Sequence, residues 1–143
     1  MNNNRAFSLK KYYLVFTVMF VIVSAGVLCY YYMNGRTLIC SIDGWQQHYK
    51  ALVYYGKYLR QIIRTVFSEH RLVIPAWDFT IAEGSDVVNT FHYYVMGDPL
   101  NLLSVLVPSR YTYILFDLLI VLREYLAGIA FSVMCFEIGR AHV

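Results

Sequence analysis

Asp43 has the position in this sequence that most suggests chemistry. It lies ten residues beyond an uncharged stretch from Tyr12 to Met33, and basic residues follow it. A carboxylate placed there could act as general base on an acceptor hydroxyl while the cations stabilise a departing phosphate. The spacing of Asp43 and Gln46 also predicts a capping box, in which the carboxylate accepts from the first helical turn. The two roles are compatible, although a carboxylate fully occupied by capping would be a poor base.

Basic residues recur after Asp43 at helical spacing. A helix over about 44–69 would carry them as one cationic stripe, because seven residues make nearly two helical turns. Such a helix, flanked by tyrosines, is typical of a membrane surface. The stripe then either touches solvent and lipid headgroups or holds the phosphate of a lipid-linked substrate. Its members are Lys50, Lys57, Arg64 and Arg71, with Arg60 beside them.

Three more carboxylates, Asp78, Glu83 and Asp86, lie within nine residues and are interrupted by a glycine. They suit a loop at a polar substrate site, where a divalent cation could also bind. They equally suit turns and caps, since Asp86 could cap a helix over 87–95. His92 follows as a lone imidazole, for which a structural hydrogen bond competes with a substrate contact. Asp98 before Pro99 predicts another capped helix start.

The composition indicates a membrane protein. Of the 143 residues, 59% are apolar and 15% charged, whereas soluble domains carry roughly 25% charged residues. This excludes a disordered or nucleic-acid-wrapping chain, and a net charge of +3 is too small to predict a polyanionic partner. We expect transmembrane helices over 12–33 and 111–136.

The positive-inside rule predicts the direction of the chain. Arg5, Lys10 and Lys11 precede the first span. Residues 1–11 are therefore expected in the cytoplasm and 34–110 outside the cell membrane, as a segment of interfacial helices. A cleaved signal peptide is the competing interpretation, but its apolar core would be shorter.

The second span contains charges that are costly in lipid. Asp117, Glu124 and Gly128 share one helical face, and Arg123 lies at its flank. No other residue supplies an obvious partner within the bilayer. The face either docks by an ion pair onto neighbouring helices or lines a cavity for a lipid phosphate or substrate. Both alternatives imply further spans.

The last residues, 138–143, do not continue this pattern. Their sequence matches a translated sequencing adapter, so we expect a non-native C-terminal segment. The chain is then an N-terminal fragment, inactive by itself, whose first partners are the missing transmembrane helices of the same protein.

Several motifs closely resemble the start of the bacterial YfhO family. They are Asp-Gly-Trp-Gln-Gln-His-Tyr at 43–49, Trp-Asp-Phe at 77–79 with Gly-Ser-Asp at 84–86, and the run from His92 to Asn101. Leu122-Arg123 and residues 125–128 also agree. Ala82 stands where relatives often have glycine.

The resemblance implies an all-α integral membrane protein that begins like a GT-C glycosyltransferase. Such enzymes use a polyprenyl-phosphate sugar donor at the outer face, and the family is linked with glycosylation of envelope polymers such as lipoteichoic acid. Their essential acidic residue in the first outer loop matches Asp43 by position. The resemblance leaves open whether Asp78, Glu83 or Asp86 supplies a second carboxylate or a metal ligand. A transporter or flippase component is the alternative, with the polar face of the second span lining a pathway.

Overall fold

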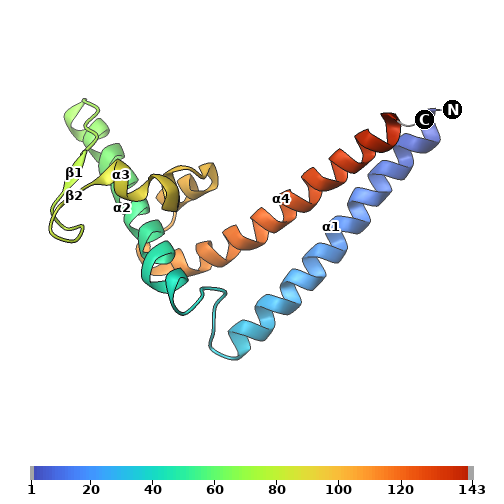
Figure 1. Ribbon diagram of the computed structural model, residues 1–143, viewed down its shortest axis with the longest axis horizontal. Helices are drawn as coiled ribbons and strands as arrows, with labels where there is room; N and C mark the ends of the chain where they lie inside the picture. Colours follow the sequence, from blue (N-terminus) through green and yellow to red (C-terminus); the bar gives the residue numbers. More distant parts are fainter. Residues whose placement is uncertain (1, 142–143) are drawn as a thin grey trace. The chain divides into compact units, whose positions relative to one another are not determined.

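The computed structural model describes residues 2–141, with side chains from residue 9 to residue 139, and this part of the chain is mostly helical. Its two long helices are α1 (Asn2–Met33) and α4 (Thr112–Ala141) (Figure 1). The segments Leu9–Met33, within α1, and Ser109–Gly139, most of it in α4, are long and apolar enough to cross a membrane. They contain both predicted spans. The expected non-native segment begins inside α4, and residues 142 and 143 lie outside the described part.

The chain forms two compact units, of which the first comprises Met1–Leu38 and Val121–Val143. In this unit α1 runs antiparallel to the C-terminal part of α4, because residues later in α1 contact residues earlier in α4. Tyr12 contacts Ser132 through their hydroxyls at 3.0 Å. Phe16 lies against Gly128, where an added Cβ would come within 2.7 Å of its ring. A small residue thus lets the helices approach closely, as in many membrane helix pairs.

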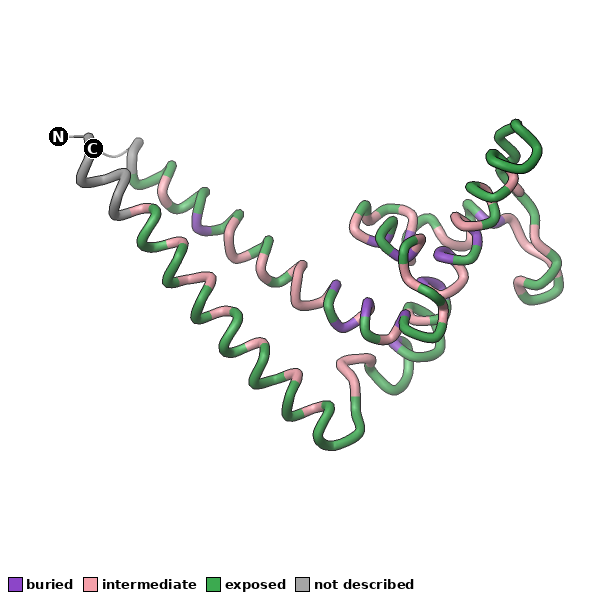
Figure 2. Tube along the Cα trace, turned by 180° about the vertical axis from the view of Figure 1, so that it is seen from behind, coloured by how far each residue is buried: buried purple, intermediate pink, exposed green. Residues whose placement is uncertain are grey.

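The second unit, Ile39–Ile120, folds around α2 (Lys50–Glu69). The 3₁₀ helix η3 (Pro99–Val105) packs against α2 at Gly56, where a Cβ would lie 2.7 Å from the Ser104 carbonyl oxygen. This close approach explains a glycine in the interior of a helix. The buried positions gather in this unit (Figure 2), and its core consists of Ala51, Leu52, Tyr55, Tyr58, Val87, Val95, Leu115 and Leu119.

A short antiparallel hairpin corrects the all-helical expectation for this unit. Strand β1 (Trp77–Asp78) pairs with β2 (Ser85–Asp86), so that Trp77 lies opposite Asp86. The connecting turn contains two left-handed backbone positions, Ala82 at φ 52° and Gly84 at φ 107°. Two-residue strands are too short to leave a period in the sequence, which is why the prediction missed them.

The helix starts follow the sequence predictions with one exception. Asp86 caps α3 (Val87–Phe91) by accepting from the Asn89 N–H at 2.6 Å. Asp98 caps η3 by accepting from the Leu100 N–H at 2.8 Å. The predicted cap at Asp43 is wrong, because its side chain makes no such bond. The remaining elements are η1 (Gly44–Tyr49), η2 (His92–Met96) and η4 (Ser109–Tyr111).

The polar residues of α4 need fewer outside partners than the sequence suggested. Asp117 is only 1% exposed, so the chain itself covers this carboxylate. Gly128 receives Phe16 of α1, and Glu124 is exposed. The expectation that one continuous polar face awaits further helices is therefore wrong for Asp117 and Gly128.

Candidate functional site

Asp43 immediately precedes η1, and the backbone around it explains why it does not cap. Its φ and ψ of −66° and −36° are already helical, whereas a capping residue is typically extended. The N–H groups it would satisfy are occupied, since Trp45 donates to the Cys40 carbonyl and Gln46 to the Ile42 carbonyl. The exposed carboxylate is left available for other contacts.

Gln47 links Asp43 to a second element, η2. Its Nε2 donates to Oδ1 of Asp43 at 3.2 Å, and its Oε1 accepts from the Tyr94 hydroxyl at 2.6 Å. The ring of His48 lies 5.3 Å from that of Tyr94. We call Asp43, Gln47, His48 and Tyr94 the Asp43 site. This chain of bonds orients one carboxylate oxygen while the other makes no hydrogen bond among the described residues.

The electrostatics of Tyr94 show that the members of the Asp43 site influence one another. The pKa of Tyr94 is raised, first by its hydrogen bond with Tyr93, then by burial and by electrostatic interaction with Tyr93 and Asp43. The phenol therefore remains protonated at neutral pH and acts as a donor. A neutral donor beside an exposed carboxylate suits a site that receives a proton from a hydroxyl nucleophile.

Both elements that carry the Asp43 site are π-helical. The segment η1 has this geometry over Gly44–Tyr49 and η2 over His92–Met96. Gly44 is buried, and an added Cβ would lie 2.9 Å from Cβ of Cys40. Single π-helical turns occur frequently at functional sites, so their coincidence here supports this position as the candidate site.

The structure changes the membership of the cationic stripe. Arg60 faces η3, where Nη1 donates to the carbonyls of Ser104 and Val107, each at 2.8 Å. Arg71 lies beyond the end of α2 and pairs with Glu69 at 3.0 Å. Arg60 therefore holds two elements together rather than extending the stripe, whose exposed members on α2 are Lys50, Lys57 and Arg64.

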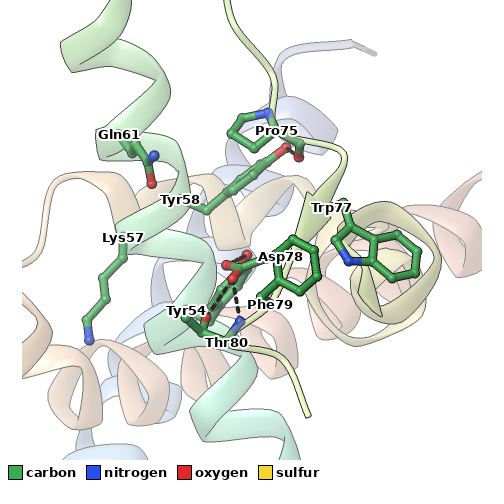
Figure 3. Close-up of a pocket in the computed structure, with 9 residues that line it drawn as sticks. All are labelled: Tyr54, Lys57, Tyr58, Gln61, Pro75, Trp77, Asp78, Phe79 and Thr80. Atoms are coloured by element: carbon green, nitrogen blue, oxygen red, sulfur yellow. Dashed lines mark hydrogen bonds between the residues drawn. The ribbon is translucent and has the colours of Figure 1, made fainter. Parts of the chain in front are cut away.

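A cleft of about 590 Å³ lies between α2 and the hairpin segment (Figure 3). Sequence reasoning did not assign its aromatic residues, although the alternation in Trp77-Asp78-Phe79 places both rings on one side of an extended strand. A depression of about 450 Å³ shares Lys57 and Gln61 with it and adds Arg60 and Arg64. The cleft is lined by Tyr54, Lys57, Tyr58, Gln61, Pro75, Trp77, Asp78, Phe79 and Thr80.

Asp78, a predicted substrate residue, reaches this cleft with its carboxylate already hydrogen-bonded. Oδ1 accepts from the backbone N–H and the hydroxyl of Thr80, each at 2.7 Å, and Oδ2 accepts from the Tyr54 hydroxyl at 2.7 Å. The Thr80 N–H is the main cause that lowers the pKa of Asp78, followed by the Tyr54 hydroxyl. Asp78 is therefore ionised at neutral pH.

The other predicted site residues do not join the cleft. Asp86 and His92 line a separate depression of about 450 Å³. His92 makes the expected structural bond, between Nδ1 and the Asn89 carbonyl at 2.8 Å. Arg123 belongs to the first unit. Among residues with described side chains, no group of three or more His, Cys, Asp and Glu could hold a metal.

Comparison with protein-family models gives no match, and comparisons with curated proteins and with solved structures give none either. What the fold itself defines is a mostly helical chain with two helices able to cross a membrane. What the chain does must be inferred from its residues and their geometry.

Proposed function

We propose that this chain belongs to a membrane glycosyltransferase of the GT-C type, as its resemblance to the YfhO family implies. The enzyme would transfer a sugar from a polyprenyl-phosphate donor to a cell-envelope polymer such as lipoteichoic acid. Two helices able to cross a membrane support a lipid-linked donor. The motif that carries the resemblance at 43–49 is also the segment that builds the Asp43 site.

The observation that carries this proposal is that the Asp43 carboxylate does not cap the helix that follows it. Its exposed carboxylate accepts one hydrogen bond, from Gln47, among the described residues. In the proposed step it accepts the proton of an acceptor hydroxyl while that oxygen attacks the anomeric carbon of the donor. The bond from the anomeric carbon to the phosphate oxygen breaks, and polyprenyl phosphate leaves with the electron pair. The configuration at the sugar is inverted.

Lys50 is placed to support the leaving group. It is exposed at the start of α2, seven residues after Asp43. A cation there would stabilise the negative charge that develops on the phosphate.

In this proposal the chain begins in the cytoplasm, so that residues 34–110 meet the donor outside. A membrane-impermeant reagent added to intact cells should therefore label a site near Gly44.

The decisive experiment is Asp43→Asn introduced at the chromosomal locus. The fold should survive, because no backbone N–H depends on this carboxylate, while sugar on the envelope polymer should disappear. The matched control is Asp98→Asn, since asparagine caps as well as aspartate. Membrane levels of both variants are compared by immunoblot. Normal polymer glycosylation with Asp43→Asn would remove Asp43 from the mechanism.

A transporter or flippase component is the second candidate. The exposed carboxylate of Glu124 within a candidate span favours it, since such residues often mark a substrate pathway. In this case Glu124→Gln would fail to rescue the deletion phenotype that wild type rescues, and Asp43→Asn would rescue it. The two proposals thus predict opposite results from the same pair of variants.

A further inference from the structure

The cleft beside the hairpin has an aromatic wall that the proposed transfer step does not use. Trp77 is 55% exposed and Phe79 80%. Their rings meet edge on, with centroids 6.4 Å apart and an angle of 64° between planes. Both lie over Gly84, where a Cβ would come within 3.1 Å of each ring. This glycine therefore permits the two rings to lie together, largely exposed, at the edge of the cleft.

Lys57 gives the opposite wall of the cleft a positive charge, and Arg64 adds a second cation in the adjoining depression. Lys57 and Arg64 lie seven residues apart on α2, about 10 Å along the helix axis. Neither forms an ion pair among the residues with described side chains. Gln61 lies between them and lines both the cleft and the adjoining depression. Unpaired cations on one helix face are complementary to a phosphate.

The carboxylate of Asp78 makes the two ends of the cleft chemically different. It lies beside the aromatic pair, across from Lys57 and Gln61 on α2 (Figure 3). Three hydrogen bonds hold it in place. An ionised carboxylate repels a phosphate but accepts hydrogen bonds from hydroxyl groups. The aromatic end therefore suits a neutral polyol and the α2 end suits an anion.

We propose that this cleft and the adjoining depression together bind a phosphate-bearing saccharide, with the sugar ring against Trp77 and the phosphate on Lys57 and Arg64. A sugar ring presents an apolar C–H face to an aromatic ring and its hydroxyls to Asp78 and Gln61. The proposal deepens the proposed function and rests on it only for the source of the ligand. That source is either the head of the lipid-linked donor or a unit of the phosphate-bearing acceptor.

The test is isothermal titration calorimetry on the complete protein in lipid nanodiscs. The probes are glucose 1-phosphate, glucose 6-phosphate, glucose and inorganic phosphate. Each phosphorylated sugar that binds should do so at least tenfold more tightly than glucose or phosphate alone. Preference for the 1-phosphate indicates the donor head, because its phosphate is on the anomeric carbon. Preference for the 6-phosphate indicates the acceptor.

The variants separate the two ends of the cleft. Trp77→Ala should weaken binding of the phosphorylated sugar and of glucose about tenfold, the effect of losing one interaction of ordinary strength. Arg64→Gln should weaken the phosphorylated sugar and phosphate but not glucose. The matched controls are Trp45→Ala, at an equally exposed tryptophan outside the cleft, and Arg71→Gln, with the same loss of charge.

Two results would overturn the proposal. One is equal affinity for phosphorylated and unphosphorylated glucose. The other is a loss of binding with Trp45→Ala and Arg71→Gln as large as with Trp77→Ala and Arg64→Gln. Because binding requires no turnover, Asp43→Asn should bind the probes normally. Failure of the transfer proposal and failure of this one are thus distinguishable.

Discussion

The hydroxyl of Tyr125 donates a hydrogen bond to Oγ1 of Thr17 at 2.8 Å, joining α4 to α1. The direction follows from the single hydroxyl proton of Thr17, which it donates to the Tyr13 carbonyl at 2.8 Å. Thr17 is therefore the acceptor between the helices.

This direction predicts unequal costs for the two deletions. Thr17→Val leaves the Tyr125 hydroxyl without a partner in an apolar setting, whereas Tyr125→Phe leaves Thr17 satisfied by its own helix. We expect Thr17→Val to cost about 1 kcal/mol more in the free energy of unfolding, measured by steric-trap unfolding in bicelles. Equal costs would contradict the assigned donor.

Arg60 should contribute to stability rather than to substrate binding. Its guanidinium donates to three carbonyls of the η3 region, which lie 44, 45 and 47 residues further along the chain. Lysine keeps the charge but cannot reproduce the planar fork. Arg60→Lys is expected to lower the free energy of unfolding by roughly 2 kcal/mol. Arg64→Lys, the control on the exposed face, should change the free energy of unfolding, measured in urea, by less than about 0.5 kcal/mol.

Gly56→Ala should separate α2 from η3. The new Cβ would meet the Ser104 carbonyl oxygen at 2.7 Å, and a backbone atom cannot move aside as a side chain can. Overpacking of this kind costs about 2 kcal/mol, which exceeds the gain in helix propensity. Gly26→Ala has open space around it and should be neutral or slightly stabilising. Thermal unfolding of the two variants in micelles compares them, and equal midpoints would refute the clash.

Ala82→Gly should stabilise the hairpin. Ala82 holds a φ of 52°, a left-handed conformation that is costly for any residue with a Cβ. Glycine removes that cost, and the expected gain is about 1 kcal/mol. Ala76→Gly is the control, because Ala76 is not at positive φ and only the unfolded chain gains freedom. Amide exchange in β1 and β2 should be slower in Ala82→Gly than in the wild type. Slower exchange in Ala76→Gly would contradict the prediction.

The hairpin should lose stability in acid through Asp78. Because the pKa of Asp78 is lowered in the folded chain, ionised Asp78 stabilises it above the ordinary aspartate pKa, about 3.9. That contribution disappears as pH falls from there through the lowered value. Tyr54→Phe removes one donor and should raise the pKa of Asp78, observed by carboxyl carbon NMR. Tyr55→Phe keeps all three hydrogen bonds to Asp78 and should leave its titration unchanged.

Local features of this chain could be predicted from the sequence because their causes lie within a few residues. Long apolar runs, the first of them uncharged, predicted two helices of membrane-spanning length. The caps at Asp86 and Asp98 were predictable because each carboxylate bonds an N–H two or three residues away. The helix over 44–69 was predicted with its correct ends, although not with its π-helical first turns.

Only the tertiary structure decided which of these residues could form a site. The Asp43 carboxylate does not cap for a local reason, because the Cys40 and Ile42 carbonyls already satisfy the N–H groups it would have capped, but packing determines what surrounds it. Gln47 meets Tyr94 across 47 residues, and the position of Arg60 depends on η3. Such long-range partners depend on how the elements pack against one another. The periodicity of apolar residues in the sequence predicts only which face of a helix is apolar. The sequence therefore determined the helices and their apolar faces, while packing determined which polar groups remained available for chemistry.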